Sequence, residues 1–89
     1  MKNVRKIQKS LNDFTHTRYP GIDNLQAHLY LLLGKKIKLK DYTEIDSTFD
    51  YCVNGFITID ENEYELQFYY LKTRNNGIYI TEVYVFKND

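Results

Sequence analysis

The sequence predicts an α+β fold in which an N-terminal helical hairpin packs on one face of a three- to four-stranded antiparallel β-sheet, arranged as a meander. Two observations lead to this prediction. Apolar residues recur at helical spacing up to Gly34 and alternate with polar residues beyond it. The 89 residues have room for a single domain, with a basic helical hairpin over 1–34 and an acidic antiparallel sheet over 35–89.

The first predicted element is an amphipathic helix over residues 2–15. Its apolar positions fall on one side of a helix, and they are Val4, Ile7, Leu11 and Phe14. Basic residues fall on the opposite side, and they are Lys2, Arg5, Lys6 and Lys9. A basic face of this kind serves either as solvated surface or as a contact for phosphate groups.

A second helix is predicted between the Pro20-Gly21 turn and Gly34, because glycine is frequent just beyond a helix C-terminus. Asp23 is a candidate N-cap, and Gln26 three residues later completes a capping-box pattern. Apolar residues lie on nearly every side of this helix. We therefore expect it to be buried on more than one side.

Beyond Gly34 the apolar residues alternate with polar ones, which is typical of strands. Residues 36–40 predict a short strand with one lysine-covered face. Residues 48–60 allow two interpretations, because Asn54-Gly55 is a typical hairpin dipeptide. A hairpin there would pair acidic with apolar residues, whereas a continuous strand separates them onto two faces. We therefore predict one long strand with Gly55 at a bulge or bend.

Two further strands complete the predicted meander. A turn over residues 60–63 leads into a strand over 64–71, and a loop over 73–77 leads into a last strand over 78–86. The last strand is predicted to be apolar on both faces, with Ile78, Ile80, Tyr84 and Phe86 on one and Tyr79, Val83 and Val85 on the other. Two short helices can cover only one face of the sheet. We therefore expect self-association, as a homodimer, through this strand or the aromatic sheet face.

The sequence contains little that is typical of an enzyme. The two histidines are far apart, Cys52 is the single cysteine, and no glycine-rich phosphate loop or metal-ligand pair occurs. Acidic residues on adjacent strands can hold Mg²⁺ for phosphodiester cleavage, but the lysine expected near them is missing. We therefore expect no catalytic residue, no cofactor and no metal ion.

The composition also bears on location and origin. The N-terminal residues lack the continuous apolar core of a signal peptide, and no apolar run approaches the length of a membrane span. We expect a cytoplasmic protein without membrane contact. Residues with A/T-rich codons, such as Lys, Asn, Ile and Tyr, are abundant, whereas Ala and Trp are scarce. This bias indicates a low-GC bacterium, its phages or its mobile elements.

The charges are divided between the two halves of the chain. Residues 1–40 hold nine Lys or Arg and two acidic residues, a net charge of +7. Residues 41–89 hold three Lys or Arg and ten Asp or Glu, a net charge of −7. Such asymmetry indicates that the partner is nucleic acid or a protein that handles nucleic acid.

The acidic half is the predicted working surface. Its carboxylates repel one another where a tight turn brings them together, and a basic partner would offset that repulsion. Tyrosines lie among these carboxylates, and tyrosine is a frequent anchor of protein interfaces. The candidate partner-binding residues of the acidic sheet are Asp50, Asp60, Glu61, Glu63, Glu65 and Tyr69.

Three functions are compatible with these observations. The first is a non-enzymatic inhibitor of the anti-CRISPR or anti-restriction type, encoded by a phage or mobile element, whose acidic tyrosine-rich sheet docks on a basic surface of a nucleic-acid-handling protein. The second is a small nucleic-acid-binding regulator that uses the basic residues of the first helix. The third is an immunity protein or antitoxin, which the sequence does not separate from the first.

Overall fold

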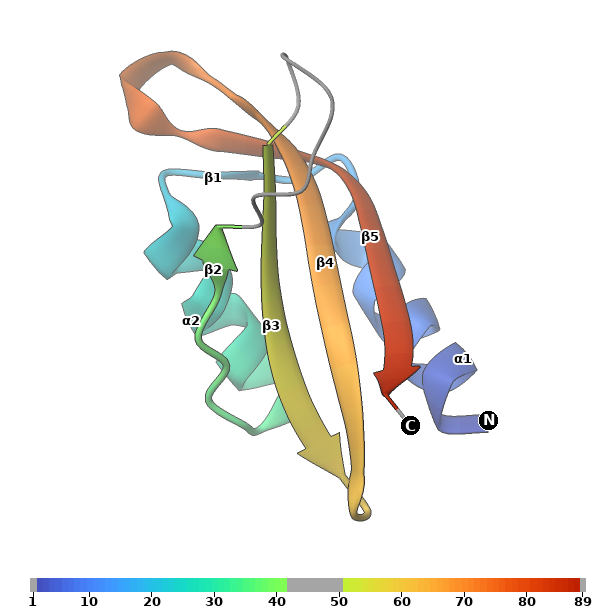
Figure 1. Cartoon of the computed structure of the whole chain (residues 1–89). Helices are drawn as coiled ribbons and strands as arrows, with labels where there is room; N and C mark the ends of the chain where they lie inside the picture. The colour runs from blue at the N-terminus through green and yellow to red at the C-terminus, as the bar shows by residue number, and fades with distance from the viewer. Residues whose placement is uncertain (1, 42–50, 89) are drawn as a thin grey trace.

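The computed structural model describes residues 2–41 and 51–88. Its elements are α1 (Lys2–Leu11), the 3₁₀ turn η1 (Asn12–Phe14), β1 (Arg18–Tyr19), α2 (Ile22–Leu33), β2 (Lys40–Asp41), β3 (Tyr51–Ile59), β4 (Asn62–Lys72), the 3₁₀ turn η2 (Arg74–Asn76) and β5 (Ile78–Asn88). The strands form one antiparallel sheet in the order β1-β5-β4-β3-β2. Both helices lie on the same face of this sheet (Figure 1). The predicted α+β fold with an antiparallel meander is confirmed.

The connection between the helices contains a strand that the sequence pattern did not predict. β1 pairs with the first residues of β5 at the edge of the sheet. Just before β1, the N–H of His16 donates to the carbonyl of Ile80 at 2.7 Å, and the N–H of Ile80 donates to the carbonyl of Thr17 at 2.9 Å. A strand of two residues is too short to show alternation, so it leaves no periodic signal in the sequence.

The core fills the space between the two helices and the sheet. α1 packs against β5, and Phe14 of η1 meets Phe68 of β4 edge-on with ring centroids 6.0 Å apart. The helical half contributes Ile7, Leu11, Phe14, Leu25 and Leu29, and the sheet contributes Val53, Ile57, Tyr64, Leu66, Phe68, Tyr70, Ile78, Ile80, Val83 and Val85.

A glutamine side chain joins α1 to the edge of β5. The Nε2 of Gln8 donates to the carbonyl of Val83 at 2.9 Å, and the N–H of Val85 donates to its Oε1 at 3.0 Å. The amide thus satisfies two backbone groups of β5 in the way that a neighbouring strand would. This pair of bonds fixes α1 relative to the sheet.

α2 begins differently from the prediction. Gly21, not Asp23, occupies the N-cap position, and no side chain caps the helix start. The predicted capping box is therefore wrong. Gln26 instead accepts the N–H of Leu39 at 2.6 Å, which ties α2 to the segment that follows it. Gly34 ends the helix as predicted, in the left-handed conformation with φ of 69°.

β3 is one continuous strand, as predicted, and it pairs with β4 without a register shift along its whole length. The bulge predicted at Gly55 is therefore wrong. Glycine is needed there for space: an added Cβ would lie 2.6 Å from the Cγ2 of Ile37 and 3.0 Å from the Cδ2 of Leu39. The predicted alternation of buried apolar and exposed lysine side chains over 36–40 is confirmed, although strand pairing begins only at Lys40.

β5 is not apolar on both faces, which corrects the predicted alternation. The pairing of β4 with β5 shifts at a bulge, where Thr81 is the additional residue of β5. The hydroxyl of Thr81 donates to the carbonyl of Tyr69 at 3.2 Å. Because the extra residue reverses the alternation, Val83 and Val85 are buried with the apolar residues that precede the bulge. The strand itself therefore gives no reason to expect self-association.

The β3–β4 hairpin closes through two residues, Asp60 and Glu61, rather than through the four predicted for this turn. Their φ angles are 52° and 69°. Two-residue hairpin turns of type I′ require such positive angles, because their twist matches that of the strands. A residue with a Cβ pays roughly 1–2 kcal/mol for this conformation, and Asp tolerates it better than Glu.

We expect Glu61→Gly to raise the free energy of unfolding by about 1 kcal/mol, because glycine adopts a positive φ without steric cost. Glu61→Gln is the matched control, since it removes the charge and keeps the Cβ. The midpoints of urea unfolding give both values. If the two variants are equally stable, relief of charge repulsion and not backbone strain explains the gain.

Candidate functional site

The face of the sheet opposite the helices is called the outer face here (Figure 1). The strand register places on it the side chains that alternate with the core residues. They are Cys52, Asn54, Phe56 and Thr58 of β3, Glu63, Glu65, Gln67 and Tyr69 of β4, and Glu82, Tyr84 and Phe86 of β5. The outer face is thus acidic and aromatic.

One row of the outer face combines both kinds of side chain. Phe56, Glu65 and Phe86 lie directly opposite one another on β3, β4 and β5, so Glu65 occupies the strand position between two phenylalanines. Phe56 is 51% exposed and Phe86 is 46% exposed. Large apolar side chains that remain this exposed, close together and surrounded by polar residues, are typical of interaction surfaces.

Two amide side chains of the neighbouring cross-strand pair bind the carboxylate of Glu65. Asn54 donates to its Oε2 at 3.1 Å, and Gln67 donates to the same oxygen at 3.0 Å. These bonds fix the orientation of the carboxylate. A carboxylate has about four acceptor positions, so capacity remains for donors from a partner. The centre of the outer face therefore holds a preorganised anionic group on a strand whose neighbours carry exposed aromatic side chains.

Aromatic packing continues from this row along β4 and β5. Tyr69 meets Tyr84 edge-on with ring centroids 5.8 Å apart, and Tyr84 stacks on Phe86 at 6.3 Å. The negative charge of Glu82 raises the pKa of Tyr84, because it disfavours the phenolate. A side-chain hydrogen bond between the two residues also raises this pKa, so the hydroxyl proton of Tyr84 already has an acceptor in Glu82.

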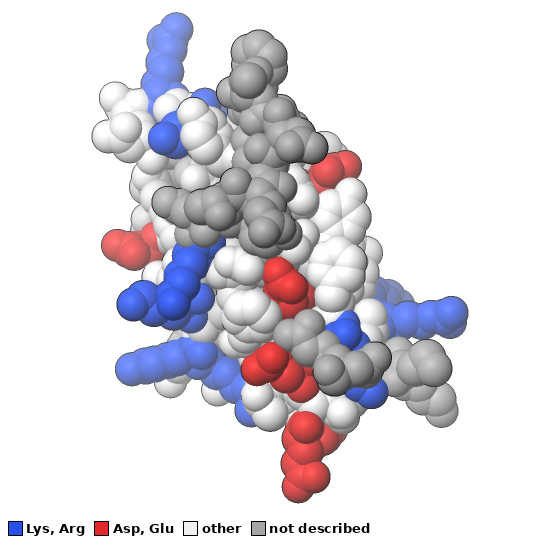
Figure 2. Space-filling view, viewed as in Figure 1, with Lys and Arg blue, Asp and Glu red and all other residues white. Residues whose placement is uncertain are grey.

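The structure brings together most of the acidic residues predicted to bind a partner. Three of the predicted residues lie on the outer face along β4, and they are Glu63, Glu65 and Tyr69. Asp60 and Glu61 form the exposed turn that immediately precedes β4. Asp50 lies outside the described residues. Figure 2 shows acidic side chains down the middle and lower part of this face, with Lys and Arg around its margins.

The sequence pattern does not identify the two phenylalanines or the two amide side chains of the outer face as candidate partner-binding residues. Phe56 shares the parity of Asn54 in β3, so the alternation already placed it away from the core. Simple alternation along β5 predicts Phe86 on the same face as Ile80, and only the bulge at Thr81 moves it to the other face. The pairing of Phe56 with Phe86 across Glu65 therefore needs the register of three strands.

Cys52 is also on the outer face but is only 3% exposed. Burial raises the pKa of its thiol to about 11, and the nearby charge of Glu65 adds to this effect. The thiol therefore stays protonated near neutral pH and is a poor nucleophile. Among the residues that the structure describes, no three His, Cys, Asp or Glu side chains are placed to hold a metal ion.

The basic residues predicted to contact nucleic acid lie elsewhere. Arg5, Lys6 and Lys9 are exposed on α1, which packs against β5, and Lys2 is the first residue of that helix. α1 lies on the face of the sheet opposite to the outer face (Figure 1), so these basic residues and the acidic residues of the outer face belong to two separate surfaces.

The comparisons with known proteins add no relative to this description. The chain matches no protein-family model, no curated protein and no solved structure. Neither helix of the described ranges is long and apolar enough to cross a membrane. The function is therefore argued from the geometry of the outer face.

Proposed function

We propose that this protein is a non-enzymatic inhibitor or regulator whose outer face docks on a basic surface of a nucleic-acid-handling protein. The observation that supports this proposal is the row in which amide-bound Glu65 occupies the strand position between half-exposed Phe56 and Phe86. A phage or mobile-element inhibitor of the anti-CRISPR or anti-restriction type fits such a surface. An immunity protein or antitoxin would use the same chemistry.

The row favours an arginine side chain of the partner. A guanidinium is planar: its edge donates two hydrogen bonds to a carboxylate, and its faces pack on aromatic rings. Glu65 provides the carboxylate, while Phe56 and Phe86 flank it. Proteins that bind nucleic acid present arginines of this kind to phosphates. The acidic outer face itself would repel phosphates, which disfavours direct contact of this face with nucleic acid.

We expect the outer face to bind hexa-arginine more tightly than hexa-lysine, because only the guanidinium combines bidentate bonding with ring packing. Titration of the ¹⁵N-labelled protein, followed by amide chemical shifts, locates and measures both interactions. Glu65→Gln should weaken hexa-arginine binding about tenfold or more, since a charge-assisted pair contributes roughly 1.5–3 kcal/mol.

Asp13→Asn is the matched control, because it removes one exposed carboxylate of η1 away from the outer face. It should leave hexa-arginine binding within about twofold of the wild type. Equal binding of the two peptides, with Glu65→Gln and Asp13→Asn behaving alike, would indicate general charge attraction and contradict the proposed role of the row.

Nucleic-acid binding through α1 is the second candidate function. Arg5, Lys6 and Lys9 are all exposed on this helix, so their charged groups are accessible to phosphates. This candidate uses a different surface from the first. Charge reversal on each surface separates the two functions, as argued in the Discussion.

A further inference from the structure

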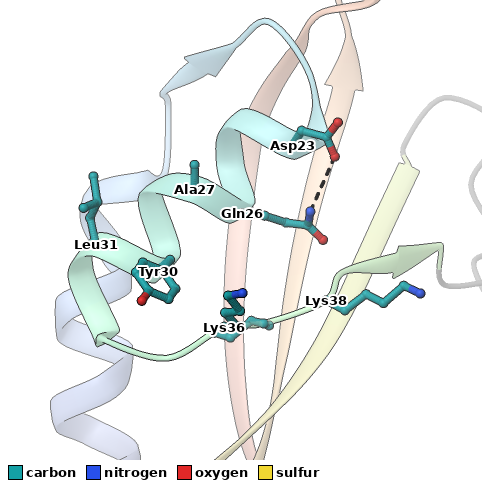
Figure 3. Close-up of a pocket in the computed structure, with 8 residues that line it drawn as sticks. Asp23, Gln26, Ala27, Tyr30, Leu31, Lys36 and Lys38 are labelled. Atoms are coloured by element: carbon teal, nitrogen blue, oxygen red, sulfur yellow. Dashed lines mark hydrogen bonds between the residues drawn. The ribbon is translucent and has the colours of Figure 1, made fainter.

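Two cavities of the described surface are lined by different kinds of charge. The first is a groove beside α2 (Figure 3), where Leu31 is 80% exposed. This exposure corrects the expectation that α2 is buried on more than one side. Acidic and basic side chains both line the groove, and they are Asp23, Lys36 and Lys38. The groove therefore does not select a ligand of one charge.

The second cavity is a pocket where β1, β4 and β5 meet the loop that contains η2. Its volume of about 510 Å³ lies in the range of sites that hold small organic ligands. Strand pairing builds one wall, since Tyr79 of β5 lies between Arg18 of β1 and Leu71 of β4. The other lining residues are Lys72, Thr73 and Arg74. Within the described part of the chain, the lining thus holds three cationic side chains and no carboxylate.

Aromatic rings hold two of the three cations. The Cζ of Arg18 lies 5.5 Å from the centroid of the Tyr79 ring, and the hydroxyl of Tyr79 is hydrogen-bonded to the Nδ1 of His16 at 2.8 Å. The Nζ of Lys72 lies 4.4 Å from the centroid of the Tyr51 ring. A cation–π contact orients a cation without cancelling its charge. The positive charge of the pocket therefore remains available to an anion.

The third cation, Arg74, belongs to a loop that its own backbone fixes. The N–H of Thr73 donates to the carbonyl of Gly77 at 2.9 Å, and the N–H of Gly77 donates to the carbonyl of Arg74 at 3.4 Å. An added Cβ at Gly77 would meet the Oγ1 of Thr73 and lie 3.2 Å from the carbonyl oxygen of Tyr19, so the loop packs closely on β1. The guanidinium of Arg74 takes no part in these bonds.

We propose that this pocket binds the terminal phosphate of a nucleotide, either free or at the 5′ end of a nucleic-acid strand. A terminal phosphate carries a charge of about −1.5 to −2 near neutral pH, which three cations match better than they match a single carboxylate. Arg18 and Arg74 can each donate two parallel hydrogen bonds to phosphate oxygens, while Lys72 acts as a point charge. The pocket is larger than a phosphate ion, and the half-exposed side chain of Leu71 offers apolar surface to the nucleoside.

The carboxylates of the outer face lie too far away to repel this ligand strongly. Glu65 precedes Lys72 on β4 by roughly 23 Å, at about 3.3 Å per residue, and exposed charges farther apart than about 8 Å are largely screened at physiological ionic strength. By strand register, Glu82 is the nearest carboxylate of the described strands. Its hydrogen bond to Tyr84 directs it along β5 away from Tyr79 and the pocket.

Titration of the ¹⁵N-labelled protein with AMP, followed by amide chemical shifts, tests the pocket. We expect saturable changes at Arg18 and over residues 72–77, and binding of adenosine at least about tenfold weaker, because adenosine lacks the phosphate. Arg74→Gln should weaken AMP binding about tenfold or more, and Arg18→Gln on β1 should have the same effect. Arg5→Gln is the matched control, because it removes one exposed arginine from α1, and it should stay within about twofold of the wild type.

Two oligonucleotides distinguish the sources of the phosphate. One is a short single strand with a 5′ phosphate, and the other is the same strand without it. Tighter binding of the phosphorylated strand than of AMP supports recognition of a strand end, whereas equal binding supports recognition of a free nucleotide. In both cases removal of the 5′ phosphate should weaken binding of the strand about tenfold. Circular dichroism verifies that the variants are folded.

Equal binding of AMP and adenosine, or equal binding of AMP by Arg74→Gln and Arg5→Gln, would overturn the proposal. Equal binding of AMP and O-phosphoserine would also contradict it, because the pocket would then ignore the nucleoside. This proposal does not depend on the proposed partner. Glu65→Gln should leave AMP binding unchanged and Arg74→Gln should leave hexa-arginine binding unchanged, so failure of one proposal is distinguishable from failure of the other.

Discussion

Replacement of Glu61, Glu63 and Glu65 by Lys is expected to abolish binding of the protein partner. The three substitutions reverse the charge of the turn and of the middle of the outer face, where we propose that basic groups of the partner bind. Like charges brought together across an interface cost several kcal/mol. A micromolar complex has only about 8 kcal/mol of binding free energy, so the loss removes measurable affinity.

Replacement of Arg5, Lys6 and Lys9 by Glu is the matched variant, because it also reverses three exposed charges but does so on α1. It should retain partner binding. The partner is isolated from a host lysate with the wild-type protein, and its affinity for each variant is then measured by calorimetry. Circular dichroism establishes that both variants are folded.

Nucleic-acid binding through α1 predicts the opposite pattern. Affinity for DNA would then fall steeply with salt, and the α1 variant would reduce the slope of log affinity against log salt by about 2–3. Sub-micromolar binding of the wild type to duplex or single-stranded DNA near physiological salt, unchanged in the Lys variant of the outer face, would make α1 the working surface.

The arrangement of helices and long strands was accessible from the sequence, because the apolar period changes at Gly34. Alternation also decided correctly against a hairpin at Asn54-Gly55. β1 was not predicted, because a strand of two residues is too short to show alternation of apolar and polar residues. The bulge at Thr81 escaped it because a bulge depends on how two strands pair and not on the residue types within one strand.

The sequence was enough to predict that the candidate site is acidic, but not how its side chains are arranged. Clustering of Glu63 and Glu65 follows from alternation along one strand. The position of Glu65 between Phe56 and Phe86 depends on the register of three strands and on the bulge. The exposure of Leu31 on α2 could not be predicted from the sequence either. Whether an apolar helix is buried depends on how much covering surface the rest of the chain provides.

Gly55→Val is expected to lower the free energy of unfolding by about 2–3 kcal/mol. A Cβ at this position would lie 2.6 Å from the Cγ2 of Ile37, 3.0 Å from the Cδ2 of Leu39 and 3.2 Å from the carbonyl oxygen of Lys38. The side chains can shift slightly, but the carbonyl belongs to a backbone segment whose next residue is hydrogen-bonded to Gln26. The clash therefore cannot be relieved by one rotamer change.

Strand propensity acts in the opposite direction, since valine is preferred over glycine in a strand by up to about 1 kcal/mol. Thr58→Val measures a valine on the same strand without the clash, because Thr58 is exposed on the outer face. We expect that control to remain within about 0.5 kcal/mol of the wild type. The steric cost of valine should exceed its gain in strand propensity only at Gly55, where residues 37–39 pack against β3.

A double-mutant cycle with Ile37→Ala connects the loss of stability to this crossing. Ile37→Ala alone removes a buried side chain and destabilises the protein, but it also removes the atom nearest to the new Cβ. The double variant should therefore lose at least about 1 kcal/mol less than the sum of the single losses, by urea unfolding. If the losses are additive, or Gly55→Val is as stable as Thr58→Val, Ile37 does not press on Gly55.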